Sequence, residues 1–210
     1  MLEIFISGGP VMYPLLLCSI IVLTVIVERF YFWLKTDMHS NRTLVDEILE
    51  LSRHGQWEQI KEKTTDIGDY LVRILISGIL HREFSMARAM EASANDEIKR
   101  MRQFMAILDT MITVAPLLGI FGTVIGIITS FEILGTSGIE HPEAVTAGIA
   151  QALITTATGL GIAILTVFPF NYFNSRIENA ALRIEKYATS LEIVYEKLDP
   201  KREEDSGEGL

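Results

Sequence analysis

Side chains with hydroxyl or amide groups lie inside two stretches of the chain that carry no charge. Thr123 lies within residues 110–131. Gln151 and Thr156 lie within residues 144–175. In a membrane, such polar groups tend to face a bundle interior or a water-filled path, because hydrocarbon offers them no partner. None of these groups titrates near neutral pH. If protons cross here, another chain must therefore bring the carboxylate that holds them.

Small residues accompany these polar groups and leave a second interpretation open. Gly122 and Gly126 form a small-xxx-small pair, which lets two membrane helices approach closely. The other candidate packing and lining residues in the two stretches are Pro116, Gly119, Ala152, Thr155 and Gly159. Either they line a pore, or the hydroxyls bond to carbonyls of their own helix and the small residues only pack helices together.

Few residues elsewhere could do chemistry. Asp109 is the acid nearest the 110–131 stretch, and it is either a solvated carboxylate or a group at the mouth of a path. No combination of nucleophile, base and orienting group, no metal-ligand spacing and no phosphate loop is present, so we expect no enzyme, catalytic residue, cofactor or metal. The net charge of −9 argues against nucleic-acid binding.

Three uncharged stretches must position these residues, and each is long enough to cross a bilayer. They are residues 4–27, 110–131 and 144–175, at or beyond the roughly 20 apolar residues that a membrane helix needs. All 18 Lys and Arg residues lie in 29–102 and 176–202. The positive-inside rule then predicts a multi-pass protein of a bacterial inner membrane, with the N-terminus and the 132–143 loop outside and the C-terminus in the cytoplasm.

The predicted fold is an all-α membrane protein with three transmembrane helices, of which the second and third extend into a cytoplasmic helical bundle. Breaks are expected near Gly55, Gly68 and Phe84, and one helix is expected to run from Ser85 to near Gly135. The predicted segments are a periplasmic N-terminus (1–9), transmembrane helix 1 (10–34), a cytoplasmic helical domain (35–104), transmembrane helix 2 (105–135), a periplasmic loop (136–146), transmembrane helix 3 (147–174), a cytoplasmic helix (175–198) and a disordered tail (199–210).

Two long motifs carry a resemblance to a known family. Residues 115–127 read APLLGIFGTVIGI and residues 148–160 read GIAQALITTATGL. They resemble the signatures of the second and third helices of the ExbB/TolQ (MotA/TolQ/ExbB) proton channel family. The opening GGPVMYPL at 8–15 and the VER at 27–29 resemble the start of members with a shorter N-terminus. The resemblance covers nearly the whole chain from residue 8 to about residue 198.

The resemblance implies a homopentamer embedded in membrane lipids, with helices two and three lining a central channel. It implies that two copies of a single-helix ExbD/TolR-like partner lie in the channel, with a transmembrane Asp as the proton carrier. The pore threonines of the family fall on Thr123 and Thr156. Proton flow would energise a TonB/TolA-like envelope-spanning protein, for outer-membrane transport or for envelope maintenance.

One position departs from the family pattern. The best-known members have Glu where this chain has Gln151, and an amide cannot titrate as a carboxylate does. Two alternatives to an ExbB-type uptake role stay open: a TolQ-type role in the cell envelope, and a non-conducting oligomeric membrane scaffold.

Overall fold

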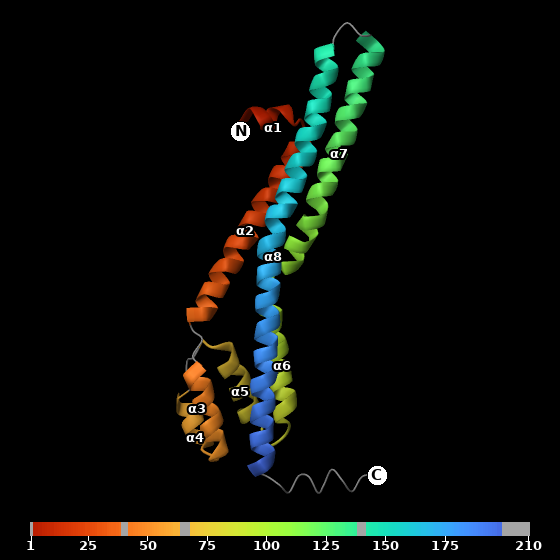
Figure 1. The fold of residues 1–210 in the computed structure, drawn as a ribbon. Helices are drawn as coiled ribbons and strands as arrows, with labels where there is room; N and C mark the ends of the chain where they lie inside the picture. Colours follow the sequence, from red (N-terminus) through yellow and green to blue (C-terminus); the bar gives the residue numbers. More distant parts are fainter. Residues whose placement is uncertain (1, 39–41, 64–67, 138–141, 199–210) are drawn as a thin grey trace, which may run out of the picture. The chain divides into compact units, whose positions relative to one another are not determined.

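The computed structural model describes residues 2–38, 42–63, 68–137 and 142–198, and every regular element within them is a helix (Figure 1). The helices are α1 (Leu2–Ser7), α2 (Met12–Met38), α3 (Arg42–Arg53), α4 (Trp57–Lys63), α5 (Tyr70–Leu80), α6 (Met86–Met101), α7 (Met105–Ser137) and α8 (Pro142–Leu198). Three helical segments are long and apolar enough to cross a membrane, namely Met12–Met38, Met86–Gly135 and Val145–Leu198. The predicted all-α class with three membrane helices is confirmed.

The chain forms two compact units. The first unit contains Met1–Phe30 and Phe104–Asn174, and the second contains Tyr31–Gln103 and Ser175–Leu210. Helices α2 and α8 each contribute to both units. The predicted tail at 199–210 and the centre of the predicted 136–146 loop lie outside the described residues.

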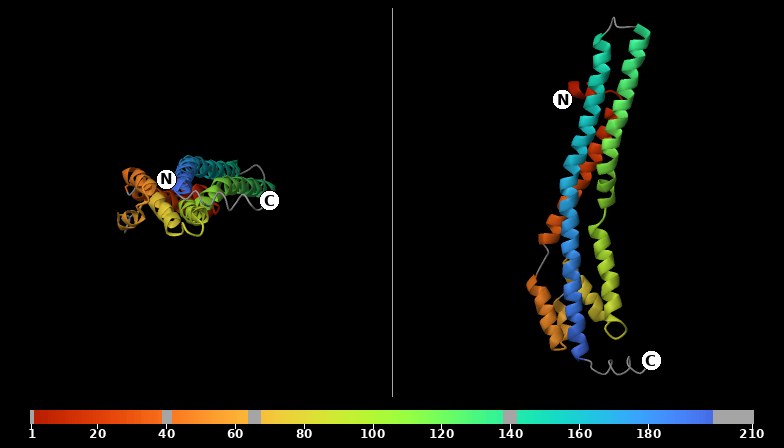
Figure 2. Two further views of the ribbon diagram at one scale, coloured as in Figure 1. Left: turned by 90° about the horizontal axis from the view of Figure 1, so that it is seen from below. Right: turned by 45° about the vertical axis from the view of Figure 1, so that its right-hand side comes forward.

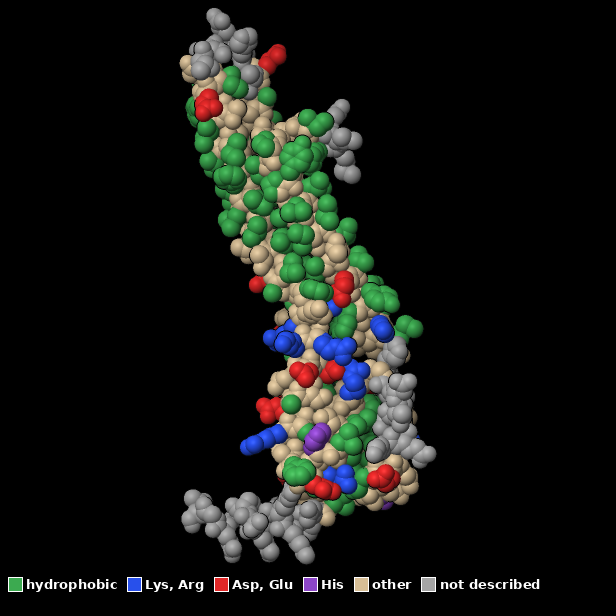
Figure 3. Space-filling view, turned by 180° about the vertical axis from the view of Figure 1, so that it is seen from behind, with side chains coloured by type: hydrophobic (Ala, Val, Ile, Leu, Met, Phe, Trp, Pro, Cys, Tyr) green, Lys and Arg blue, Asp and Glu red, His purple; other side chains and the backbone are tan. Residues whose placement is uncertain are grey.

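In the first unit, α7 and the first half of α8 run side by side (Figures 1 and 2). A small core of Val11, Met12, Leu15 and Ala115 joins α2 to this pair. Large apolar side chains instead point outward, and Leu153 is 66% exposed. Figure 3 shows hydrophobic side chains over most of the visible face of this unit. This arrangement suits hydrocarbon as the surrounding solvent rather than water.

In the second unit, α3 to α6 pack with the second half of α8 around an apolar core. Ile48, Ile74, Met90 and Leu191 are each at most 1% exposed. The hydroxyl of Tyr195 on α8 donates to the carbonyl of Arg82, 3.0 Å away, just after α5. Most Lys and Arg side chains visible in Figure 3 lie on this unit.

The predicted breaks near Gly55, Gly68 and Phe84 are found, and Gly55 has the positive φ of +67° that favours glycine. The structure has one further break that no pattern in the sequence indicates. The helix expected to be continuous from Ser85 is interrupted between Met101 and Met105, where Phe104 has a φ of +64°. The Arg29 guanidinium lies 5.5 Å from the centre of the Phe104 ring, so a contact to α2 favours the turn.

Candidate functional site in α7 and α8

Glycines bring α7 and α8 into direct backbone contact. A Cβ added to Gly159 would lie 2.4 Å from the carbonyl oxygen of Ala115. One added to Gly119 would lie 2.9 Å from the carbonyl oxygen of Thr155, and one added to Gly126 would lie 2.7 Å from that of Gly148. No larger residue fits at these positions without a shift of the helices. The small residues therefore allow the polar groups of the two helices to meet.

Thr123 and Thr156 meet at this contact. Their hydroxyl groups hydrogen-bond to each other across the helix pair. The Thr156 hydroxyl also lies 3.1 Å from the Gly119 carbonyl oxygen, and that of Thr123 lies 3.2 Å from the carbonyl oxygens of both Gly119 and Ala152. Each hydroxyl has one proton to donate, so the pair has more acceptors than protons. The protons can therefore be arranged in more than one way without moving the helices.

Thr155 is fully buried and serves the packing of the helices. Its hydroxyl donates to the Ala152 carbonyl at 2.9 Å, and a Cβ on Gly122 would lie 2.5 Å from it. Ala152 is itself only 2% exposed and lies against Gly126. The structure therefore places Thr155 inside the α7–α8 contact.

Gln151 lies apart from the threonine pair. A Cβ on Gly9 would lie 2.3 Å from the Gln151 amide nitrogen, so this side chain covers the turn between α1 and α2. Gly9 also has a φ of +70°, so a substitution there would be unfavourable both for the backbone conformation and for the space that Gln151 occupies. The half-buried amide thus faces the start of α2.

Asp109 is exposed on the first turns of α7, and its backbone carbonyl accepts a hydrogen bond from the Thr113 hydroxyl at 3.4 Å. It lies fourteen residues before Thr123, which corresponds to roughly 21 Å along a helix. Pro116 lies between them, inside α7. The structure therefore does not bring Asp109 to the threonine pair.

Two features of the first unit were not among the sequence candidates. The Ser130 hydroxyl, on a side chain that is 4% exposed, lies 2.9 Å from the Gly126 carbonyl and 3.1 Å from that of Val145. Ser130 lies four residues after Gly126, at the same spacing as Gly122 and Gly126, and this spacing could have identified Ser130 as a packing residue. Arg29 is 1% exposed and pairs with Glu28, and no local pattern predicts its burial.

The site therefore contains hydroxyl groups in close helix packing, within segments that carry no acid, base or histidine from residue 110 to residue 131 and from 145 to 175. In the described part of the chain, no group of three or more His, Cys, Asp or Glu side chains could hold a metal ion. This chemistry can guide a proton or water but provides no group to hold a charge.

Three apolar spans, two of them packed through glycines with polar groups between them, define a multi-pass membrane protein. The model of the MotA/TolQ/ExbB proton channel family matches residues 69–186. The chain belongs to the MotA/TolQ/ExbB proton channel family and is a channel subunit rather than an enzyme.

Individual relatives cover most of the chain. Biopolymer transport protein ExbB-like 3 of Synechocystis sp. is 32% identical over 94% of this chain and 96% of its own length. ExbB-like 1 of the same organism is 34% identical over 94% of this chain and 80% of its own length. The Tol-Pal system protein TolQ of Pseudomonas aeruginosa is 36% identical over 52% of this chain and 47% of its own length.

Proposed function

We propose that this chain is the pore-forming subunit of an inner-membrane motor driven by the proton-motive force. The observation that carries the proposal is the Thr123–Thr156 hydroxyl pair, held between two uncharged spans with more acceptors than protons. In this proposal Asp109 would lie at a mouth of the path, whereas Thr155 would pack the two helices and Gln151 would cover Gly9. Family membership supports proton conduction as the activity.

The motor needs a partner, because the spans contain no group that titrates near neutral pH. An ExbD/TolR-like protein with a single membrane helix would supply a carboxylate inside a ring of these subunits. A proton arriving from outside would neutralise that carboxylate, and its release would restore the charge. Each change alters how strongly the carboxylate attracts the hydroxyls around it, so the partner could turn in steps within the ring.

The charge distribution supports one orientation. With all Lys and Arg in 29–102 and 176–202, the N-terminus and the 132–143 loop would face the periplasm. The segments 35–104 and 175–198 would then form the cytoplasmic helical part. We propose a homopentamer with two partner copies, which passes work to a TonB/TolA-like envelope-spanning protein.

Relatives of both branches match the chain, so the ExbB-type uptake role and the TolQ-type envelope role are both candidates. The longer coverage of the ExbB-like relatives favours the first.

The proposal is tested by removing one hydroxyl at a time. Thr123→Val and Thr156→Val keep the side-chain shape, and in proteoliposomes that contain the partner each should lower proton flux by roughly tenfold or more, because a desolvated proton loses a hydrogen bond. The matched control is Thr129→Val, since the exposed Thr129 hydroxyl bonds only to the Ile125 carbonyl of its own helix among the described contacts.

The second candidate function, a non-conducting scaffold, is favoured by the backbone contacts at Gly119 and Gly159. Under that alternative the two valine variants would lose the assembled complex itself. Native mass spectrometry of the same preparations distinguishes the two. An intact complex without flux supports the channel, whereas a dissociated complex supports the scaffold.

A further inference from the structure

A cavity of about 270 Å³ opens in the second unit, away from the threonine pair. Its charged lining comes from three helices: Lys35 on α2, Arg73 on α5, and Glu97 and Arg100 on α6. Drug-sized ligands occupy roughly 300–1,000 Å³, so this cavity suits a small polar group.

Cations outnumber carboxylates among the described residues that line the cavity. Arg73 forms a two-pronged ion pair with Glu97 at 2.9 Å and 2.9 Å, and Arg100 lies 3.4 Å from the same carboxylate. Among the described lining residues, one carboxylate therefore faces three cations.

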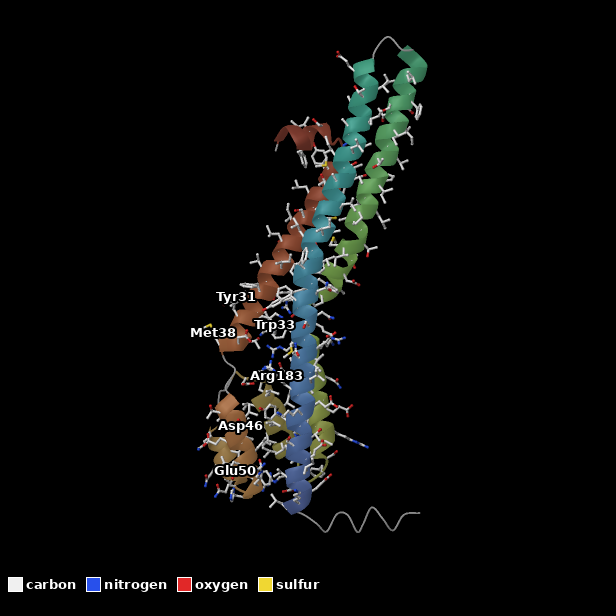
Figure 4. All side chains as sticks on the ribbon, in the orientation of Figure 1. Tyr31, Trp33, Met38, Asp46, Glu50 and Arg183 are labelled. Carbon is white, nitrogen blue, oxygen red and sulfur yellow. The ribbon has the colours of Figure 1, made fainter. Side chains whose placement is uncertain are left out.

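Buried hydrogen-bond donors in the same unit lack acceptors within the described chain. They are the Tyr70 hydroxyl, the Trp33 indole nitrogen and the Nε atom of Arg183. Tyr70 lines the cavity and is 3% exposed. Trp33 is 2% exposed and points toward α8, whereas Tyr31 and Met38 point away from it (Figure 4). Buried donors without acceptors are rare in folded proteins. Of the three, Tyr70 lines the cavity, so an anion bound there would accept its hydrogen bond.

The Tyr70 hydroxyl stays a donor over the physiological range. Burial raises its pKa, while the Arg183 guanidinium acts in the opposite direction and the Asp69 carboxylate reinforces the rise. Arg176 and Asp37, which pair with each other, also act on Tyr70 with opposite signs. A neutral phenol can donate to an anion but cannot repel it.

The position of Lys35 along α2 indicates which anions can reach the cavity. Lys35 lies eight residues after Val27, the end of the first uncharged stretch, which corresponds to roughly 12 Å of helix. Phe30, Tyr31 and Trp33 lie between them, and aromatic residues favour the headgroup layer of a bilayer. Phosphate groups are the most abundant anions at this depth.

We propose that the cavity is a phosphate-binding site, in which Lys35 and Arg100 pair with the anion and Tyr70 donates a hydrogen bond to it. Arg73 acts as a positioning residue that holds Glu97 away from the anion. The phosphate can come from the headgroup of an anionic phospholipid or from free phosphate. The site does not use the residues of the proton path.

The test uses delipidated, detergent-purified full-length protein and counts bound ligands by native mass spectrometry. Phosphatidylglycerol should bind to the wild type better than zwitterionic phosphatidylcholine. The double variant Lys35→Gln/Arg100→Gln should weaken phosphatidylglycerol binding by roughly tenfold or more, because each surface cation contributes appreciably to binding an anionic lipid. Lys99→Gln is the matched control, because exposed Lys99 is the neighbour of Arg100 on α6 and does not line the cavity.

Tyr70→Phe separates binding from folding. It removes only the hydroxyl, so it should weaken binding severalfold while the thermal midpoint of the ligand-free protein stays equal or rises. Added inorganic phosphate distinguishes the two sources. Failure of phosphate to displace the lipid indicates a headgroup site, and displacement indicates a site for free phosphate. Equal binding of both lipids and of phosphate by wild type and double variant would overturn the proposal.

Discussion

At the scale of single residues, the proposed path depends on hydroxyl groups, because the uncharged stretches around them have no group that titrates near neutral pH. The Thr123 and Thr156 hydroxyls are half-buried, and they bond to one another and to two backbone carbonyls. Such hydrogen bonds contribute only about 0.6 kcal/mol each to the stability of membrane helix pairs. Their loss should therefore affect conduction more than folding.

Gln151 provides a residue-scale prediction about the departure from the family pattern. Gln151→Glu places a carboxylate beside Gly9, five residues and roughly 7.5 Å of helix from Thr156. Because the threonine pair does not contact this position, proton flux in proteoliposomes should stay within about twofold of wild type, a change of less than 0.5 kcal/mol. A large increase in flux with a new pH dependence would show that the path needs an acid here.

Glu192, near the end of α8, gives a prediction about pH. Burial, followed by the neighbouring Glu196 carboxylate, raises its pKa above the ordinary value of 4.5. The folded state therefore binds this proton more tightly than the unfolded state. As pH rises from about 4.5 through the folded-state pKa, ionisation of Glu192 lowers the free energy of unfolding.

Glu192→Gln should accordingly raise the thermal midpoint at neutral pH, and the gain should disappear as the pH falls to about 4.5. Melting curves of the detergent-solubilised protein between pH 4 and pH 8, monitored by circular dichroism, measure this difference. Glu185→Gln, at an exposed position on the same helix, is the control. A gain that is equal at all pH values would contradict the prediction.

At the scale of helices, backbone contact between α7 and α8 determines whether the threonines can meet. Gly159 and Gly161 provide a matched pair on α8, since a Cβ on Gly159 would lie 2.4 Å from the Ala115 carbonyl oxygen and one on Gly161 would meet no atom within 4 Å. Gly159→Ala should destabilise the protein by about 1–3 kcal/mol, as overpacking does elsewhere. Gly161→Ala should leave stability unchanged or raise it by up to about 1 kcal/mol.

Thermal melting of the two variants in the same detergent tests the contact, and proton flux tests its consequence. Gly159→Ala should also lower flux, because it separates Thr123 from Thr156. Equal melting midpoints for the two variants would mean that the backbones are not in contact at Ala115.

Much of the helix organisation could be predicted, because length, absence of charge and helical periodicity are local properties. The spans and the breaks at Gly55, Gly68 and Phe84 follow from such patterns. The turn before α7 could not be predicted, since it contains neither Gly nor Pro and Phe104 contacts Arg29, 75 residues earlier in the chain. Short helix α1 likewise has no strong local signal.

The candidate site was predictable in composition but not in arrangement. The motifs identified Thr123 and Thr156, yet only the structure shows that these two meet while Gln151 covers Gly9 and Asp109 lies apart. Which polar group faces which neighbour depends on helix rotation. Small residues permit many rotations, so the sequence alone does not select one.

At the scale of the whole protein, large apolar side chains remain exposed on both helices of the pair. Leu117 and Phe121 on α7 are 58% and 56% exposed, and Leu165 and Phe168 on α8 are 72% and 71% exposed. In a membrane these surfaces can contact lipid or other subunits, and neither contact buries a polar group. Assembly into a ring is therefore compatible with the chemistry of these faces.

The assembly gives the last prediction. Native mass spectrometry of the protein purified with its single-helix partner should show five copies of this chain and two of the partner. Two partner helices would each present one carboxylate to a ring of five threonine pairs. Because five subunits cannot be divided equally between two carboxylates, the two carboxylates cannot both have the same surroundings. Loss or gain of one proton would then favour the next position over the present one, which is what stepwise rotation requires. A dimer, or a ring that never takes up the partner, would leave the membrane path without a titratable group and would favour the scaffold.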